Sequence, residues 1–124
     1  MVGAAIKRHL PPELPVMAAL AETGLKNLPA GDPDSVGFFQ MRVGVWEHEY
    51  PGYENRPDLQ LRWFLDRAKD ALRARNQSGL SSGPAGYGDW IADVERPEGQ
   101  YRGHFQLRLA EARKLVHEAC GGGQ

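Results

Sequence analysis

The sequence predicts a mainly α-helical single domain. Two stretches, residues 58–75 and 101–118, carry apolar side chains at the three- and four-residue spacing of an amphipathic helix. Strand-like alternation is scarce along the chain. The 124 residues include 15 glycines and 9 prolines, which interrupt regular structure, so we expect short elements joined by many turns. A chain of this length can bury one core without disulfides or metals.

In the first half of the chain, a helix is expected to open within residues 11–15 and to continue over residues 16–25. Proline is tolerated in the first turn of a helix, and three prolines stand just before this stretch, whereas Pro29 prevents its extension. Residues 29–35 are rich in turn formers. The apolar residues 36–45 are compatible with either a short helix or strands.

In the second half, the longest predicted helix spans residues 58–75 and has Pro57 in its first turn. Its charged face, opposite the apolar one, is typical of a solvated surface. Residues 76–88 predict a loop, because they are rich in glycine and serine. A short helix around Trp90 is expected to end before Pro97. The last helix follows over 101–118.

Charge and composition exclude several classes of protein. With 15 basic and 16 acidic side chains the net charge is −1, whereas a nucleic-acid-binding domain usually has a basic surplus. The sequence has no apolar run of the roughly 18 residues that a membrane span needs. Cys120 is the only cysteine, so a disulfide framework is excluded. We therefore expect no nucleic-acid partner, no membrane span and no cofactor.

The two ends suggest a module of a larger protein. The N-terminal residues 1–10 are too short and too weakly apolar for a secretory signal peptide. The glycine-rich residues 121–124 are typical of a linker. We expect residues 1–124 to form one domain with its core over about 11–118, excised from a longer chain.

Glu22 is the first candidate for chemistry. It lies near the end of the apolar helix VMAALAETGL, where its carboxyl group reaches either solvent or a cleft. Burial against alanine and leucine would raise its pKa and make it a proton donor near neutral pH. A surface glutamate at a helix end is the alternative, and helical periodicity alone favours it.

Residues 21–42, AETGLKNLPAGDPDSVGFFQMR, closely resemble the catalytic core of lytic transglycosylases and related lysozyme-like peptidoglycan hydrolases. In that superfamily a helix ends in a glutamate and a small hydroxyl residue, here Glu22-Thr23. A turn-rich loop and a Ser-x-Gly-x-x-Gln element follow, here Ser35, Gly37 and Gln40. A looser likeness continues through residues 57–64 and 90–101. The closest likeness is to domains of actinobacterial cell-wall proteins and phage tail proteins.

Three differences from the family pattern are visible. Thr23 replaces the usual serine, and Phe38 replaces leucine. The family's Ala-Tyr-Asn-Ala-Gly element is absent, so the tyrosine that it supplies has no clear counterpart in this sequence.

The resemblance implies a lysozyme-like fold with a cleft between the Glu22 helix and the helices over 58–75 and 101–118. It also implies cleavage of the β-1,4 glycosidic bonds of peptidoglycan, with Glu22 as the general acid that protonates the leaving oxygen. The peptidoglycan glycan strand is then the partner, together with neighbouring domains of a parent protein. The location would be extracellular, in the cell wall or on a virion. A near-neutral charge suits a tethered module better than a free basic lysozyme.

The same resemblance suggests substrate-binding roles for several other residues. Ser35 would orient the Glu22 carboxyl group, and Gly37 would leave room for a sugar ring. Gln40 offers both a donor and acceptors to hydroxyl or N-acetyl groups. Flat aromatic faces for sugars would come from Phe39, Tyr87 and Tyr101. Core packing is an equally good explanation for Phe39.

Two outcomes can follow protonation of the leaving oxygen. The muramic acid 6-hydroxyl can attack and give a 1,6-anhydro product, which needs a single glutamate and is the favoured route. Hydrolysis needs a second carboxylate to activate water, for which Asp32 and Asp34 are the candidates, although turn formation is the slightly favoured explanation for both. A glycan-binding or structural module without chemistry is the alternative function.

No metal site is expected. Glu47-His48-Glu49 is the densest group of metal-ligating residue types, but no second histidine follows at ligand spacing.

Overall fold

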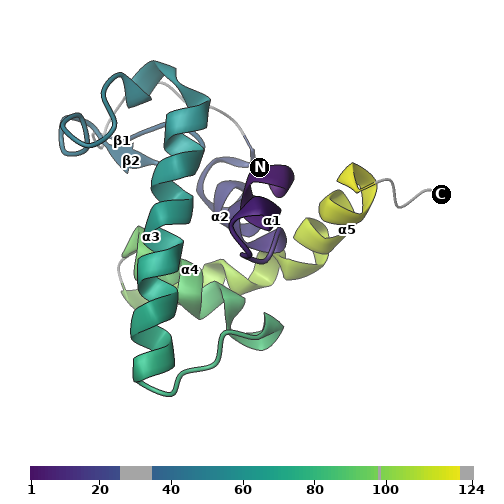
Figure 1. The fold of residues 1–124 in the computed structure, drawn as a ribbon. Helices are drawn as coiled ribbons and strands as arrows, with labels where there is room; N and C mark the ends of the chain where they lie inside the picture. Colours follow the sequence, from purple (N-terminus) through teal and green to yellow (C-terminus); the bar gives the residue numbers. More distant parts are fainter. Residues whose placement is uncertain (26–34, 98, 121–124) are drawn as a thin grey trace.

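The computed structural model describes residues 1–25, 35–97 and 99–120, and within these ranges the chain is mainly helical, as predicted (Figure 1). The α-helices are α1 (Val2–Lys7), α2 (Glu13–Thr23), α3 (Pro57–Gln77), α4 (Tyr87–Glu95) and α5 (Leu109–Ala119). Short 3-10 helices are η1 (Tyr53–Asn55), η2 (Pro84–Gly86), η3 (Gly99–His104) and η4 (Gln106–Arg108). Strands β1 (Ser35–Val36) and β2 (Met41–Arg42) form an antiparallel hairpin.

Most of the predicted helices are confirmed. Helix α2 ends where Gly24 adopts a left-handed φ of 65°, which glycine does without steric cost. Helix α3 begins with proline at its first position and extends two residues beyond the predicted end. The apolar stretch 36–45, for which helix and strand were both open, forms the hairpin and its following turns. Helix α1 was not predicted.

The predicted helix over residues 101–118 is wrong in its first half. Residues 99–108 form the 3-10 helices η3 and η4, and the α-helix begins only at Leu109. Gly99 and Gly103 lower the helix propensity of this stretch, and Phe105, which is buried, anchors it in the core. The predicted loop over 76–88 is also shorter than expected, because it includes η2 and the start of α4.

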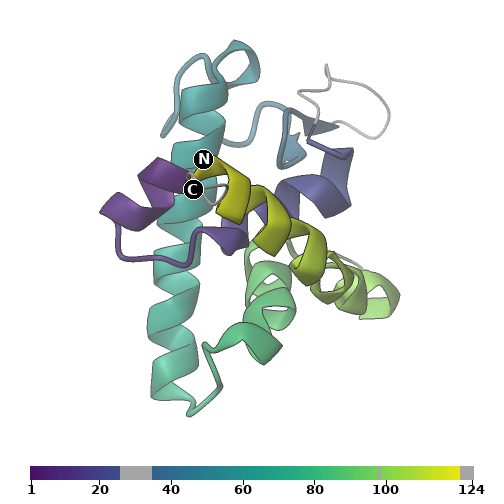
Figure 2. The ribbon, with the colours of Figure 1, turned by 90° about the vertical axis from the view of Figure 1, so that its right-hand side faces the viewer.

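Helix α2 is the centre of the core. Its residues 14–20 are all buried, because it packs against α5 on one side and also contacts α1, α3 and α4. The two views of the ribbon show α3 as the long helix on one side of the molecule and α5 on another (Figure 2). The indole Nε1 of Trp90 donates a 2.9 Å hydrogen bond to the carbonyl oxygen of Ala68, which joins α4 to α3.

The hairpin is fixed to α3 by one stacked ring pair and one buried amide. The rings of Phe39 and Phe64 stack with centroids 4.8 Å apart. The side chain of Gln60 is fully buried; it accepts a hydrogen bond from the Phe38 amide at 3.2 Å and donates one to the Tyr53 carbonyl at 2.9 Å. The turn that follows β1 is therefore held rigidly over the start of α3.

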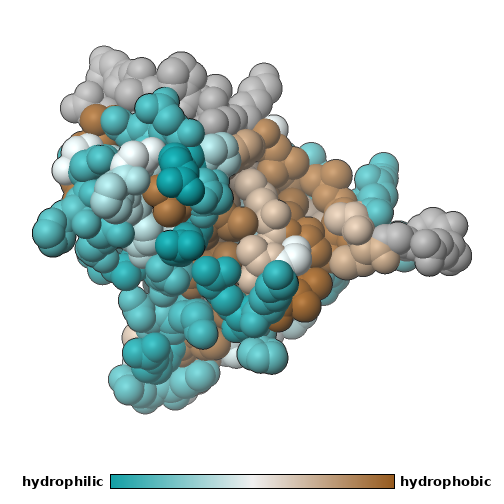
Figure 3. Space-filling model, turned by 45° about the horizontal axis from the view of Figure 1, so that its top comes forward, coloured by the Kyte–Doolittle hydropathy of each residue, from teal (hydrophilic) through white to brown (hydrophobic). Residues whose placement is uncertain are grey.

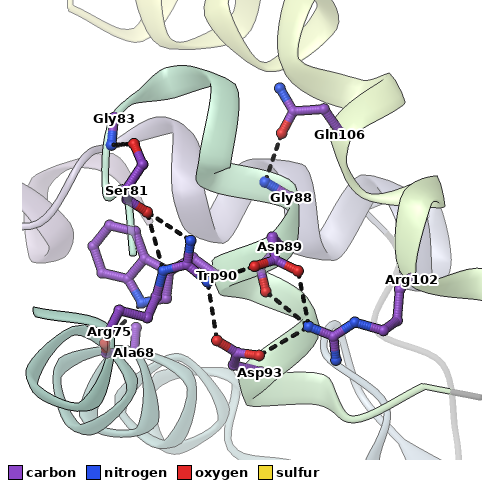
Figure 4. Close-up of polar contacts among 10 residues, drawn as sticks. All are labelled: Ala68, Arg75, Ser81, Gly83, Gly88, Asp89, Trp90, Asp93, Arg102 and Gln106. Carbon is purple, nitrogen blue, oxygen red and sulfur yellow. Dashed lines mark hydrogen bonds and ion pairs between the residues drawn. The ribbon is translucent and has the colours of Figure 1, made fainter. Parts of the chain in front are cut away.

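A network of charged residues fixes α4 against α3 and η3 (Figure 4). The guanidinium of Arg75, which is only 3% exposed, lies 2.7 Å from Asp89 and 3.1 Å from Asp93 and also donates to the Ser81 carbonyl. Arg102 of η3 approaches the same two carboxylates at 3.0 and 2.9 Å. Since α4 ends two residues after Asp93, this network positions the residues that follow.

The molecular surface is uneven in polarity. Figure 3 shows a face on which hydrophobic residues gather beside the C-terminal end, while hydrophilic residues cover the other side. The exposed large apolar side chains of the described residues include Ile6 of α1, at 50% exposure. Among the described helices, none combines the length and the apolar character that crossing a membrane requires.

Candidate active site

Glu22 lies in the wall of a pocket of about 670 Å³. Four parts of the chain form this pocket: the end of α2, the hairpin, the end of α4 with the residues after it, and η3. They contribute Ala21 and Glu22; Ser35, Gln40 and Arg42; Glu95, Arg96 and Pro97; and Tyr101 and His104, with Phe105 directly after η3. Residues that are far apart in the sequence therefore surround the carboxyl group that the sequence singled out.

The environment of Glu22 suits proton donation. Burial raises the pKa of its carboxyl group from 4.5 to about 7, because the charged form loses hydration that the protein does not replace. No hydrogen bond or ion pair to this carboxyl group occurs among the described residues. A carboxyl group with this pKa still holds its proton in a large fraction of molecules near neutral pH.

The end of α2 is joined directly to the turn of the hairpin. The hydroxyl oxygen of Thr23 lies 3.1 Å from the carbonyl oxygen of Phe38 and 3.1 Å from that of Ala19. On the other side of the turn, Gln40 has a left-handed φ of 52°, and its amide donates a 2.9 Å hydrogen bond to the Gly37 carbonyl. Glu22 and Gln40 are thus held on two connected parts of the same wall.

A second pocket, of about 880 Å³, adjoins the first. It extends over α3 and is lined there by Trp63, Arg67 and Asp70, with Trp46 beside them. The two pockets have five lining residues in common, which are Gln40, Arg42, Glu95, Arg96 and Pro97. They therefore form one groove, which passes the hairpin and the end of α4.

This groove differs in part from the expected cleft. The helix over 58–75 contributes to it, as predicted, but α5 does not line it. The end of α4 and η3 take that place, because the residues that would have continued α5 towards its N-terminus form 3-10 helices instead.

Glu95, which the sequence analysis missed, lines both pockets. It is the last residue of α4, and its Oε1 atom is buried without a hydrogen-bond partner in the described structure. Burial raises the pKa of Glu95 well above its ordinary value, and the charge of Glu22 raises it further. One sequence signal was available: Glu95 follows Ile91 by four residues and so lies on the buried face of its helix.

Positive charge in the groove comes from four arginines. Arg67 pairs with Glu49 and Asp70, and Arg102 pairs with Asp89 and Asp93. Arg42 and Arg96 are exposed, and neither forms an ion pair within the described ranges. Both of these unpaired arginines lie where the two pockets meet, so an anionic group in the groove would find two available cations.

Three further predicted residues lie beside Glu22. Ser35, Gln40 and Tyr101 all line the same pocket; Tyr101 is 46% exposed, and its ring is in edge contact with His104. No hydrogen bond joins Ser35 to Glu22 in the part of the chain that the structure describes. The orienting role of Ser35 therefore stays a prediction.

Three other predicted residues do not line either pocket. Phe39 is fully buried in the core, so its ring offers no face to a sugar in this structure. A Cβ atom at Gly37 would collide with the buried Gln60 side chain, and the φ of 86° also favours glycine, which explains this glycine without a sugar. Tyr87 lies at the start of α4, partly buried and in edge contact with Trp90.

Two further points of the sequence analysis concern the second carboxylate and metal binding. Asp32 and Asp34, the candidate second carboxylates, lie outside the described residues. Within the described ranges, no group of three or more histidine, cysteine, aspartate or glutamate side chains is arranged to hold a metal ion.

Comparison of the chain with models of known protein families, with curated proteins and with solved structures found no match.

Proposed function

We propose that the protein cleaves the β-1,4 glycosidic bonds of peptidoglycan glycan strands, with Glu22 as the general acid. The observation that carries this proposal is the position of Glu22: its carboxyl group lies in the wall of a groove, and its pKa is about 7. Glycosidic cleavage requires a carboxylic acid that is still protonated when the leaving oxygen needs a proton.

The shape and the lining of the groove support a polymeric sugar as the substrate. Two adjoining pockets of about 880 and 670 Å³ provide an extended site rather than a closed cavity for one small molecule. Gln40 offers hydrogen bonds to hydroxyl or N-acetyl groups, and Tyr101 offers an exposed ring face. Arg42 and Arg96 suit the carboxylates that muramic acid and its peptides carry.

The resemblance of residues 21–42 to lytic transglycosylases supports both the reaction and a lysozyme-like fold. In this proposal α2 delivers Glu22, and the hairpin over residues 35–42 delivers Ser35 and Gln40 to the same pocket. Attack by the muramic acid 6-hydroxyl, which gives a 1,6-anhydro product, is the preferred outcome. Hydrolysis by water is the other outcome. The proposed setting is extracellular, in a cell wall or on a virion, as one module of a larger protein.

The test is digestion of purified peptidoglycan by the wild-type protein, by Glu22→Gln and by the control Glu118→Gln, with the products identified by mass. Glu118 is an exposed glutamate of α5, outside the groove. We expect release of fragments by the wild type and by the control, and loss of release by Glu22→Gln. Anhydro-sugar ends would establish transglycosylation, and reducing ends would establish hydrolysis. Equal release by all three proteins would refute the role of Glu22. Binding without any release would instead indicate a glycan-binding module.

A further inference from the structure

Glu95 and Glu22 approach the same pocket from the ends of two different helices. Glu22 is the penultimate residue of α2, and Glu95 is the last residue of α4. Directly after Glu95, Arg96 adopts a left-handed φ of 51° although it is not a glycine, and Pro97 follows. A left-handed residue is a common way to end a helix, and here it ends α4 at the residue whose carboxyl group lines the groove.

The Glu95 carboxyl group lacks the partners that buried polar atoms normally have. Its Oε1 atom is buried and has no hydrogen-bond partner in the described parts of the chain. Most buried polar atoms in native proteins are paired, so an unpaired one requires an explanation. The fixed position of α4, which the Arg75 network secures, makes a loosely placed side chain a poor explanation.

The charges around the two carboxyl groups do not neutralise them. The charged or titratable side chains from neighbouring elements that line the same pockets as Glu95 are Glu22 from α2, Arg42 from the hairpin, Arg67 and Asp70 from α3, and Arg102 and His104 from η3. Arg67 and Arg102 are paired with other carboxylates. Of all these groups, only Glu22 shifts the pKa of Glu95, and it raises it.

Two desolvated carboxyl groups that repel each other do not readily ionise together. Over a range of pH the pair therefore holds one proton, which exchanges between the two carboxyl groups, so that one member is an acid and the other is a base. The deeper burial of Glu95 favours the form with the proton on Glu95, and the reactive form is the one in which Glu22 holds it. A glycosidic bond is cleaved by this combination, because one group must donate a proton and another must accept one.

On the basis of the proposed function, we propose that Glu95 is a second catalytic residue, which accepts the proton of the hydroxyl group that attacks the sugar. In this step Glu22 gives its proton to the leaving oxygen, and the bond between that oxygen and the anomeric carbon breaks with its electron pair. The attacking oxygen, from water or from the sugar's 6-hydroxyl, bonds to the anomeric carbon and releases its proton to the Glu95 carboxylate. The pair then carries one proton, as it did before, and exchange through solvent returns it to Glu22. Glu95 thus has the role for which the sequence offered only Asp32 and Asp34.

The experiment compares Glu95→Gln with the wild type and with Glu118→Gln on purified peptidoglycan, over a range of pH. We expect Glu95→Gln to lower the turnover rate by about 10²–10⁴-fold, the usual effect of losing one acid–base group. The acidic limb of the pH profile, which reports ionisation of the base, should disappear in this variant. Turnover and a pH profile identical to those of the control would overturn the proposal.

A second variant separates a chemical role from a structural one. Glu95→Ala leaves space where the carboxyl group was, and azide ion is a nucleophile that needs no base. We expect added azide to restore turnover of Glu95→Ala and to give a glycosyl azide, whereas Glu22→Gln should not recover. If Glu95→Ala stays inactive with azide and the pH profile of Glu95→Gln is unchanged, the role of Glu95 is structural and the proposal is overturned.

The two Gln variants distinguish failure of this inference from failure of the proposed function. If Glu22→Gln is inactive while Glu95→Gln cleaves normally, only this inference fails. If Glu22→Gln is fully active, the proposed function itself fails.

Discussion

The hydroxyl oxygen of Thr23 lies 3.1 Å from the carbonyl oxygen of Phe38, within hydrogen-bond distance across fifteen residues of sequence. This contact joins the last turn of α2, which carries Glu22, to the hairpin turn before Gln40. The resemblance on which the functional proposal rests has a small hydroxyl residue at this position. The structure gives that residue type a physical role, because threonine and serine can both form the contact.

Replacing Thr23 with valine should therefore loosen the site more than replacing it with serine. Valine has the same shape as threonine but no hydroxyl group, so we expect Thr23→Val to lower the free energy of unfolding by about 1 kcal/mol. Urea denaturation measures this change. Peptidoglycan digestion should slow in the same variant, because Glu22 and the hairpin are less firmly connected. Equal stability of the valine and serine variants would show that the hydroxyl contact does not contribute.

The parts of the fold that could be predicted from sequence are those set by local signals. Helices α2 and α3 have proline at their starts and a clear apolar periodicity, and the left-handed Gly24 ends the first of them. The beginning of α5 was misplaced because the apolar spacing over 101–108 is helical, whereas the glycines there favour a tighter turn. Local periodicity does not distinguish an α-helix from successive 3-10 turns that present the same side chains to the core.

The site was predictable only in part, for a different reason. Glu22, Ser35 and Gln40 lie within one short stretch of sequence, and a family pattern could identify them together. Glu95 is 55 residues beyond Gln40 along the chain, and it reaches the pocket only because α4 packs against α3. Phe39 was ambiguous between a sugar platform and the core, and its stack on Phe64 depends on a contact that the sequence does not encode locally.

The stability of the protein should decrease as the pH rises towards neutrality. The pKa of Glu22 in the folded protein, about 7, lies above its ordinary value of 4.5, so the folded state holds this proton more tightly than the unfolded chain does. The resulting stabilisation is complete at pH values below 4.5, the pKa of Glu22 in the unfolded chain. It is lost as the pH rises through about 7, the pKa of Glu22 in the folded protein. Its upper limit is roughly 3 kcal/mol, and Glu95 acts in the same direction.

Urea denaturation at pH 5 and pH 8 measures this dependence. Glu22→Gln cannot ionise, so it should lose part of the difference in stability between the two pH values. Glu118→Gln should keep the full difference. A wild-type protein that is as stable at pH 8 as at pH 5 would contradict the shifted pKa values.

Gly37 should tolerate alanine less well than Gly44 does. Both residues have a left-handed φ, 86° and 80°, so each variant has the strain of an L-residue in that conformation, of about 1 kcal/mol. A Cβ atom at Gly37 would also collide with the buried Gln60 side chain, whereas at Gly44 the space is open. We expect Gly37→Ala to be less stable than Gly44→Ala by a further 1–3 kcal/mol, roughly, in urea or thermal unfolding. Equal losses would mean that Gln60 has room to move.

Arg75 should be far more important for stability than its neighbour Arg73. The buried Arg75 guanidinium compensates Asp89 and Asp93, and its removal leaves Arg102 alone with both carboxylates. We expect Arg75→Met to cost about 1–3 kcal/mol of unfolding free energy, because the hydrogen bonds of the Arg75 guanidinium to partly exposed Asp89 and Asp93 and to the Ser81 carbonyl are lost. Arg73, which is exposed, pairs with Asp70 alone among the described residues, at 3.9 Å, so Arg73→Met should change stability by less than about 1 kcal/mol. Similar effects of the two substitutions would show that the network is not a structural anchor for α4.

Tyr101 and Tyr87 were both candidates for sugar binding, but only Tyr101 lines the Glu22 pocket. Substituting leucine for either residue removes the flat ring and keeps an apolar side chain. In the Glu22→Gln background, which leaves the glycan intact during the measurement, we expect Tyr101→Leu to weaken binding of a soluble glycan strand about tenfold, or ~1.4 kcal/mol. Tyr87→Leu should leave the affinity unchanged, even if it lowers stability, because its ring contacts Trp90 rather than the groove. Calorimetric titration of the folded variants compares the two directly. Weaker binding by Tyr87→Leu alone would place the glycan on a different face of the molecule and would remove the groove from the proposed function.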